Sequence, residues 1–134
     1  MEHRRPLVAC DIGERFIGVA VSNKEHTVAF PKYVWEWKGD VVLLKSKLTA
    51  VFAEYAPEYV VVGMQEIGHS SVGARSSFEV VVGVLEGMGM KVLPVEEYVS
   101  TIEAKNRMAD VDDTPHGRYD DVAAQIILER YMQK

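Results

Sequence analysis

The sequence has a single cysteine, few prolines and no long hydrophobic run. One cysteine, Cys10, excludes both an internal disulfide framework and a cluster of thiolate metal ligands. No apolar stretch approaches the roughly 20 residues that cross a bilayer. Residues 1–6 lead directly into an apolar segment, without the pattern of a signal peptide. These absences predict a cytoplasmic protein that does not bind a membrane.

Positive charge is also in short supply. The chain carries 15 lysines and arginines against 20 aspartates and glutamates, which gives a formal net charge of -5 at pH 7. Because Lys and Arg contacts to phosphate supply most nucleic-acid affinity, this charge gives no overall attraction to nucleic acid. The balance disfavours a simple nucleic-acid-binding protein, but it is compatible with an enzyme that has a local basic surface.

Length and composition are those of one ordinary globular domain covering residues 1–134. Hydrophobic residues make up 48% of the chain and charged residues 26%, a balance typical of a protein with a substantial buried core. No internal repeat, low-complexity segment or linker divides the sequence.

Residues 7–22 contain the most informative pattern. The apolar run 7–10 predicts a buried strand that ends at Asp11, and Gly13 allows a tight turn into a second, returning strand. Gly18, within that second strand, lets another backbone come close. A lone carboxylate at the end of a core strand costs free energy unless it is paired or binds a cation. Alternatively, Asp11 caps the turn with its side chain.

The rest of the chain alternates between strands and helices. A third strand is expected within residues 27–37, interrupted at Pro31 and therefore at an edge or bend, with its aromatic stripe in the core. The further expected elements are a helix from Asp40 to just before Pro57, a strand at 59–63, a helix at about 74–88, a strand at 91–95, a short helix to about 108 and a last helix from about 120 to 131. An antiparallel meander followed by this alternation predicts an α/β protein with a mixed five-stranded sheet, the RNase H-like arrangement.

Three carboxylates fall where such a sheet could bring them together. Asp11 ends the first strand, Glu97 follows the last strand, and Asp120 begins the final helix. Clustered carboxylates repel one another unless cations lie between them, and oxygen ligands suit Mg²⁺ or Mn²⁺. Two such ions can stabilise the attacking and leaving oxygens of phosphodiester hydrolysis. Taken singly, Asp120 and Asp121 could merely cap the helix, and Glu97 could be a surface charge.

Four blocks, in order and at matching spacing, make the chain similar to the YqgF/RuvX family. They are DIG at 11–13 with IGVAVS at 17–22, VVGM at 61–64, ST with EA at 100–104, and DDVAA with IL at 120–128. The resemblance covers nearly the whole chain. It implies an RNase H-like fold related to Holliday-junction resolvases, and a nuclease that matures the 5′ end of pre-16S rRNA with divalent metal held by acidic residues. By position, those acids are Asp11, Glu97 and Asp120, while Asp121 could add a metal ligand or only cap the helix.

The chain departs from the family pattern mainly by losing positive charge. Tyr98 stands in place of an arginine, Phe16 in place of a basic residue, and the usually lysine-rich loop before the last helix is acidic at 110–113. These losses remove phosphate-binding groups near the predicted site. The predicted substrate-binding residues are the arginines that remain nearby: Arg15, Arg75 and Arg118.

Three functions are compatible with these observations. The leading hypothesis is a metal-dependent endonuclease, a monomer or homodimer that hydrolyses structured RNA or branched DNA. The second is a catalytically weak binding module that keeps the fold and recognises nucleic acid, the ribosome or another protein. The third is an actin-like ATPase, suggested by the Asp-x-Gly turn; such proteins need two domains that close over the nucleotide, and one 134-residue domain is too short.

Overall fold

A computed structural model describes residues 4–64, 72–95, 101–108 and 118–133. The elements in chain order are β1 (Val8–Ile12), β2 (Phe16–Ser22), β3 (Ala29–Glu36), α1 (Val41–Tyr55), β4 (Val60–Met64), α2 (Val72–Gly87), β5 (Val92–Pro94), α3 (Thr101–Met108) and α4 (Asp120–Met132). The five strands form one sheet in the order β3-β2-β1-β4-β5. The pairs β1–β2 and β2–β3 are antiparallel, while β4 runs parallel to both β1 and β5. The predicted mixed sheet is therefore confirmed.

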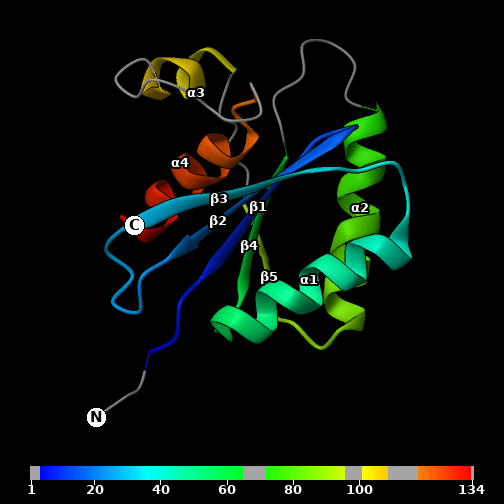
Figure 1. Ribbon diagram of the computed structural model, residues 1–134, viewed down its shortest axis with the longest axis horizontal. Coiled ribbons are helices and arrows are strands. Elements are labelled where there is room, and N and C mark those ends of the chain that lie inside the picture. The colour runs from blue at the N-terminus through cyan, green and yellow to red at the C-terminus, as the bar shows by residue number, and fades with distance from the viewer. Residues whose placement is uncertain (1–3, 65–71, 96–100, 109–117, 134) are drawn as a thin grey trace.

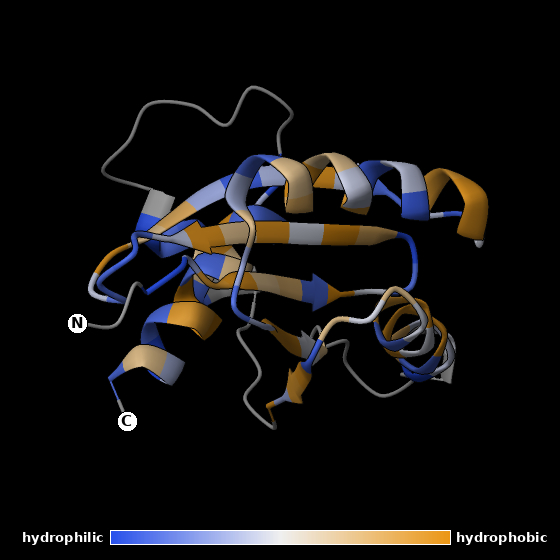
Figure 2. Ribbon diagram, turned by 90° about the horizontal axis from the view of Figure 1, so that it is seen from below, coloured by the Kyte–Doolittle hydropathy of each residue, from blue (hydrophilic) through white to orange (hydrophobic). Residues whose placement is uncertain are grey.

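The central strand β1 separates two hydrophobic cores. Val8, Cys10 and Ile12 point to the face that is covered by α1 and α2, and Ala9 points to the opposite face, which α4 covers. Figure 1 shows the sheet running diagonally between α4 on one side and α1 with α2 on the other, while α3 packs on α4. Figure 2 shows hydrophobic stretches along the strands, interrupted by hydrophilic ones. The inner strands β1, β2 and β4 are buried along almost their whole length, as expected for strands with helices on both faces, whereas the edge strand β3 is mostly exposed. No helix in the described part of the chain is long and apolar enough to cross a membrane.

The local sequence signals account for several boundaries. Asp40 caps α1 as predicted, since its carboxylate accepts a hydrogen bond of 3.0 Å from the Leu43 amide. The helix ends at Ala56, whose φ of 44° is left-handed, directly before Pro57. The predicted interruption of the third strand is milder than expected, because β3 continues through Pro31 as the edge strand of the sheet.

The register of β3 shifts where β2 passes from Val19 to Ala20. Val19 is paired with Tyr33 but Ala20 is paired with Pro31, so one residue of β3 is left out of the ladder. This irregularity accommodates a proline, which has no amide proton to donate. Of the aromatic stripe predicted to lie in the core, Trp35 and Trp37 are buried, but the prediction is wrong for Tyr33, which is exposed on the edge strand.

Gly18 of β2 allows α4 to begin directly against the sheet. A Cβ atom at this position would lie 1.9 Å from the carbonyl oxygen of Asp120, a separation that real side chains do not reach. The predicted close backbone approach at Gly18 is therefore confirmed. It places the first residue of α4 over β2, beside the end of β1.

Substitution of Gly18 by alanine is predicted to push the start of α4 away from the sheet. We expect Gly18→Ala to lower the free energy of unfolding by about 1–3 kcal/mol, the usual cost of overpacking a core. The matched control is Gly83→Ala in α2, where a Cβ would meet nothing within 4 Å, and this change should stabilise the helix by up to about 1 kcal/mol. Denaturant unfolding measures both values; equal stability of the two variants would contradict the close approach at Gly18.

Candidate active site

Asp11 occupies the penultimate position of β1, in the middle strand of the sheet. In the sheet, Asp11 is paired with Gly18 on the antiparallel strand β2 and with Gly63 on the parallel strand β4. Paired residues of adjacent strands share a face of the sheet, so a carboxylate stands here between two residues that have no side chain. Asp11 is nevertheless 0% exposed. It is a buried carboxylate with no side chain from either neighbouring strand beside it, and the start of α4 lies over Gly18 on one side.

The carboxylate of Asp11 is an unsatisfied acceptor. Within the described residues, neither of its oxygens has a hydrogen-bond partner. Burial first, and the nearby charge of Asp120 second, raise the pKa of the Asp11 carboxyl well above its usual range. The alternative that Asp11 caps the turn is wrong, because neither of its oxygens accepts a hydrogen bond from the described residues of the turn; the Gly13 amide instead donates to the Phe16 carbonyl at 2.9 Å.

Asp120 is the second acid at this place. It is 7% exposed and begins α4, whose first backbone group lies over Gly18, the ladder partner of Asp11. The N-cap of α4 is Tyr119, without a side-chain cap bond, so Asp120 is not the capping residue. The structure thus brings together two of the three predicted acids, one from each end of the chain.

The carboxylate of Asp120 is held by a neighbouring arginine. The Arg118 Nε atom donates to Oδ2 of Asp120 at 2.7 Å, and its Nη2 atom donates to Oδ1 at 3.3 Å. The next residue, Asp121, accepts a 2.9 Å hydrogen bond from the Val122 amide. That bond is compatible with a role for Asp121 at the helix start, and metal ligation by Asp121 remains a prediction.

The third predicted acid, Glu97, lies outside the described residues. Within them, no group of three or more His, Cys, Asp or Glu side chains is arranged to hold a metal ion. The acids that are described still fit a hard divalent cation. Both oxygens of Asp11 are buried without a donor among the described residues, and a second carboxylate lies beside them. Mg²⁺ or Mn²⁺ would satisfy these oxygens, since both ions prefer carboxylate ligands.

The arginines predicted to bind substrate lie on segments that meet at this edge of the sheet. Arg15 belongs to the β1–β2 turn, exposed Arg75 to the first turn of α2, and Arg118 directly precedes α4. The start of α2 lies beside the turn, because a Cβ at Gly73 would come within 2.5 Å of the Glu14 side chain. Substrate binding by these three residues remains a prediction.

One structural role was missed by sequence reasoning. In the sequence, Phe16 is notable only because it replaces a basic residue of the family pattern. In the structure, its ring lies under the guanidinium of Arg118, whose central carbon is 3.6 Å from the ring centre. The only signal for this pairing was that both residues flank the predicted acids. The loss of positive charge at position 16 is therefore offset locally by an arginine from the other end of the chain.

Cys10, next to Asp11 in β1, takes no part in this site. It points to the opposite face of the sheet and is buried in the core under α1 and α2. Burial first, and the charge of Asp11 second, raise the pKa of the Cys10 thiol to about 12. A thiol with this pKa is protonated near neutral pH and is therefore a poor nucleophile.

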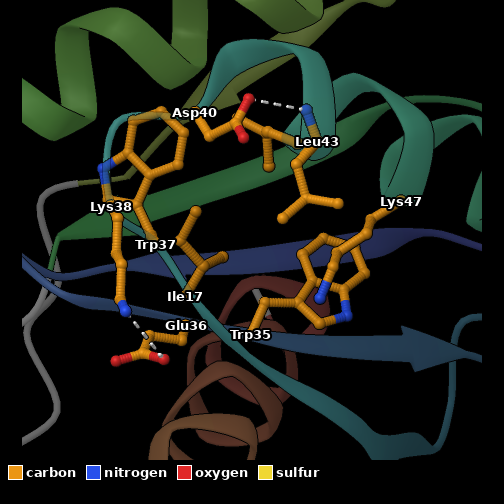
Figure 3. Close-up of a pocket in the computed structure, with 9 residues that line it drawn as sticks. Ile17, Trp35, Glu36, Trp37, Lys38, Asp40, Leu43 and Lys47 are labelled. Carbon is orange, nitrogen blue, oxygen red and sulfur yellow. Dashed lines mark hydrogen bonds and ion pairs between the residues drawn. The ribbon is translucent and has the colours of Figure 1, made fainter.

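A separate hollow of about 310 Å³ lies on the face away from the acids, between β3 and the start of α1. Figure 3 shows Trp35, Trp37 and Ile17 forming its apolar wall, with Lys47 stretched along the Trp35 ring. The Glu36 carboxylate at its rim is paired with Lys38 at 3.7 Å. None of the predicted site residues lines this hollow, so the candidate site is the acidic pair on the opposite face.

Comparisons with known proteins give a consistent result. A family model described as "RuvX: Holliday junction resolvase" matches residues 5–134. Similar chains named "Putative pre-16S rRNA nuclease" include one from Roseiflexus sp., 28% identical, and one from Dictyoglomus thermophilum, 27% identical. The matches cover 94% of this chain and 92% and 94% of those two relatives.

Solved structures support the fold alone. RuvC from T. thermophilus, in complex with a Holliday junction substrate, is similar with a TM-score of 0.59 and 14% identity, over 98% of both chains. The yeast mitochondrial Holliday junction resolvase Ydc2 has a TM-score of 0.51 and 11% identity, over 98% of this chain and 78% of that one. The RNase H-like arrangement predicted from the sequence is confirmed.

The raised pKa of Asp11 predicts that this residue destabilises the metal-free protein at neutral pH. The pKa lies above the unfolded value of 3.8, so the folded chain binds the proton more tightly, and stability is lost as the pH rises from about 4 towards the folded pKa. An asparagine does not ionise. In EDTA, Asp11→Asn should therefore melt at a higher temperature than the wild type, and the difference in melting temperature should grow as the pH rises from about 4 towards the pKa of Asp11 in the folded protein.

Asp40→Asn is the control for this prediction, because asparagine caps a helix about as well as aspartate and Asp40 is exposed. Its melting temperature should follow that of the wild type at each pH. A lower melting temperature for Asp11→Asn at pH 8 would contradict a buried, uncompensated carboxylate.

Proposed function

Because the chain belongs to the RuvX family, we propose that it is a metal-dependent nuclease that hydrolyses phosphodiester bonds, with a precursor of 16S ribosomal RNA as its substrate. The observation that carries this proposal is the buried Asp11 carboxylate, whose oxygens have no hydrogen-bond donor among the described residues and which lies beside Asp120. The names of the relatives supply the substrate. A ribosomal RNA precursor would place the protein in the cytoplasm, as the sequence predicts.

Asp11 and Asp120 are the residues that would hold Mg²⁺ or Mn²⁺, together with Glu97 and with Asp121 as a further candidate. When bound, a pair of such ions stabilises negative charge on the attacking and leaving oxygens of a phosphodiester. The chain contributes rigid ligands: Asp11 is fixed in the central strand and Asp120 in the first turn of a helix seated on the sheet. Rigid placement keeps the ligand oxygens in one geometry through the reaction.

The substrate would approach from the edge of the sheet where the β1–β2 turn and the starts of α2 and α4 meet. Arg15 and Arg75 are exposed there and are the groups proposed to contact phosphates. Because the formal net charge is -5, binding would depend on these few local cations. RNA affinity should therefore fall only shallowly as the salt concentration rises, because the slope is proportional to the number of phosphate contacts.

Cleavage of a four-way DNA junction is the second candidate function. It is favoured by the description of the family model, a Holliday junction resolvase. Two symmetric cuts would require two copies of the chain around a two-fold axis, so this activity predicts a homodimer, whereas rRNA processing is compatible with a monomer. A catalytically weak binding module is the third outcome that the experiment below distinguishes.

Replacing Asp11 by asparagine is predicted to abolish cleavage. The test incubates wild type and Asp11→Asn, each with Mg²⁺ or Mn²⁺, with a 5′-extended 16S RNA precursor and with a four-way DNA junction. We expect precursor cleavage by the wild type and at least a 100-fold lower rate for Asp11→Asn, since loss of a group that merely supports a metal ligand already costs about 10–100-fold. Asp40→Asn, which makes the same chemical change in a helix cap on the other face, should cleave at the wild-type rate.

The outcomes separate the three functions. Cleavage of the junction alone would replace the rRNA precursor with branched DNA as substrate. Binding of either nucleic acid without cleavage would favour the binding module. Equal rates for wild type and Asp11→Asn would rule out Asp11 as part of the catalytic centre.

A further inference from the structure

Arg118 is held in place from two directions. The central carbon of its guanidinium lies 3.6 Å from the centre of the Phe16 ring, and the guanidinium donates hydrogen bonds to both oxygens of Asp120, at 2.7 and 3.3 Å. Phe16 stands at the start of β2, two residues before Gly18, so it faces the same side of the sheet as Asp11. The guanidinium therefore lies at the acidic pair, although the Arg118 side chain keeps 41% of its surface exposed to solvent.

Asp11 and Asp120 differ in the hydrogen bonds that their carboxylates accept. Asp120 has a two-point, charge-assisted contact with an arginine, a strong interaction for a side chain that is 8% exposed. Asp11 has no donor within the described residues. A cation that bridged both carboxylates would bind Asp120 oxygens that already accept hydrogen bonds from Arg118, so the ion and the guanidinium, both positively charged, would compete for one carboxylate.

We propose that Arg118 is a built-in counter-ion that latches the acidic pair: it must release Asp120 before that carboxylate can ligate a divalent ion. Phe16 is the platform that keeps the guanidinium in position, since an arginine over an aromatic face is attracted to the ring. This inference rests on the proposed function only in taking Asp11 and Asp120 as metal ligands. The release would also free the guanidinium for the phosphate contact that the sequence predicts for Arg118.

Removal of Arg118 should change the metal affinity in opposite directions, depending on whether this residue is a latch or only positions Asp120. If Arg118 competes with the ion, removing its charge leaves two neighbouring carboxylates whose repulsion a divalent ion relieves, and binding becomes tighter. If Arg118 instead orients Asp120 for the ion, its removal loosens the ligand and binding becomes weaker. The sign of the change in the dissociation constant therefore decides between the two.

The experiment is calorimetric titration with MnCl₂ of the wild type, Arg118→Gln, Phe16→Leu and Arg15→Gln. We expect the dissociation constant of Arg118→Gln to be about tenfold lower than that of the wild type, a change equivalent to about 1.4 kcal/mol. Phe16→Leu keeps the arginine but removes the aromatic platform, so its affinity should lie between those two.

Arg15→Gln is the matched control for the loss of one positive charge. Arg15 lies 5.9 Å from the centre of the same ring but pairs with Glu36 at 3.7 Å. Its manganese affinity should stay close to that of the wild type. An equal gain in manganese affinity in Arg15→Gln and Arg118→Gln would show that the loss of any nearby positive charge has this effect. That result would overturn the latch.

A measurement on the wild type covers the case in which Arg118→Gln fails to fold. Addition of Mg²⁺ should move the Arg118 Nε–H resonance in a ¹H–¹⁵N spectrum, because its hydrogen bond to Asp120 is broken. An unmoved resonance at saturating Mg²⁺ would overturn the latch.

Failure of the latch can be distinguished from failure of the proposed metal site. If the wild type binds Mn²⁺ through Asp11 and Arg118→Gln binds it equally or more weakly, the latch is wrong and the metal site stands. If only Arg118→Gln binds Mn²⁺, the latch is supported in its strongest form. If neither protein binds Mn²⁺, the acidic pair is not a metal site and both proposals fail.

Discussion

The site depends on one constraint: a carboxylate is buried in the central strand of the sheet without a hydrogen-bond donor among the described residues. A buried charge of this kind is unfavourable for folding, so the surrounding structure has to supply compensation or tolerate the cost. Glycines occupy the paired positions on both neighbouring strands, so neither strand places a side chain beside Asp11. One of them, Gly18, also lets α4 seat against the sheet and bring Asp120 to the same place. Burial of Asp11 lowers the folding stability of the metal-free protein, and the resulting pair of acids is one that a bound cation would stabilise.

Much of the fold could be predicted because its signals are local. Apolar runs bounded by glycine, proline or aspartate define the strands, and Asp40 and Pro57 mark the ends of α1. The meander followed by alternating helices fixes the sheet order. The detail that differed was Pro31, where the strand continues because a register shift removes one residue from the ladder.

The meeting of Asp11 and Asp120 could be predicted from the sequence, whereas the electrostatic surroundings of this pair could not; Glu97 lies outside the described residues. Asp11 and Asp120 follow from their positions at the ends of elements that meet at one edge of the sheet. The contact between Phe16 and Arg118 joins residues that are far apart in the sequence, and no periodic pattern predicts it. The sequence alone therefore showed only that position 16 lacks a positive charge. In three dimensions, the aromatic residue places a cation beside Asp120. Net charge alone is thus a poor guide to the local field at this site.

The most direct test of this account is the pKa of Asp11, measured by ¹³C NMR titration of its carboxyl group with and without Mg²⁺. In EDTA, the pKa should lie well above 3.8 because the group is buried and close to Asp120. With saturating Mg²⁺, it should fall sharply, since a bound cation favours the ionised form. An ordinary pKa in EDTA, or one that Mg²⁺ leaves unchanged, would contradict a buried carboxylate arranged to hold a metal ion.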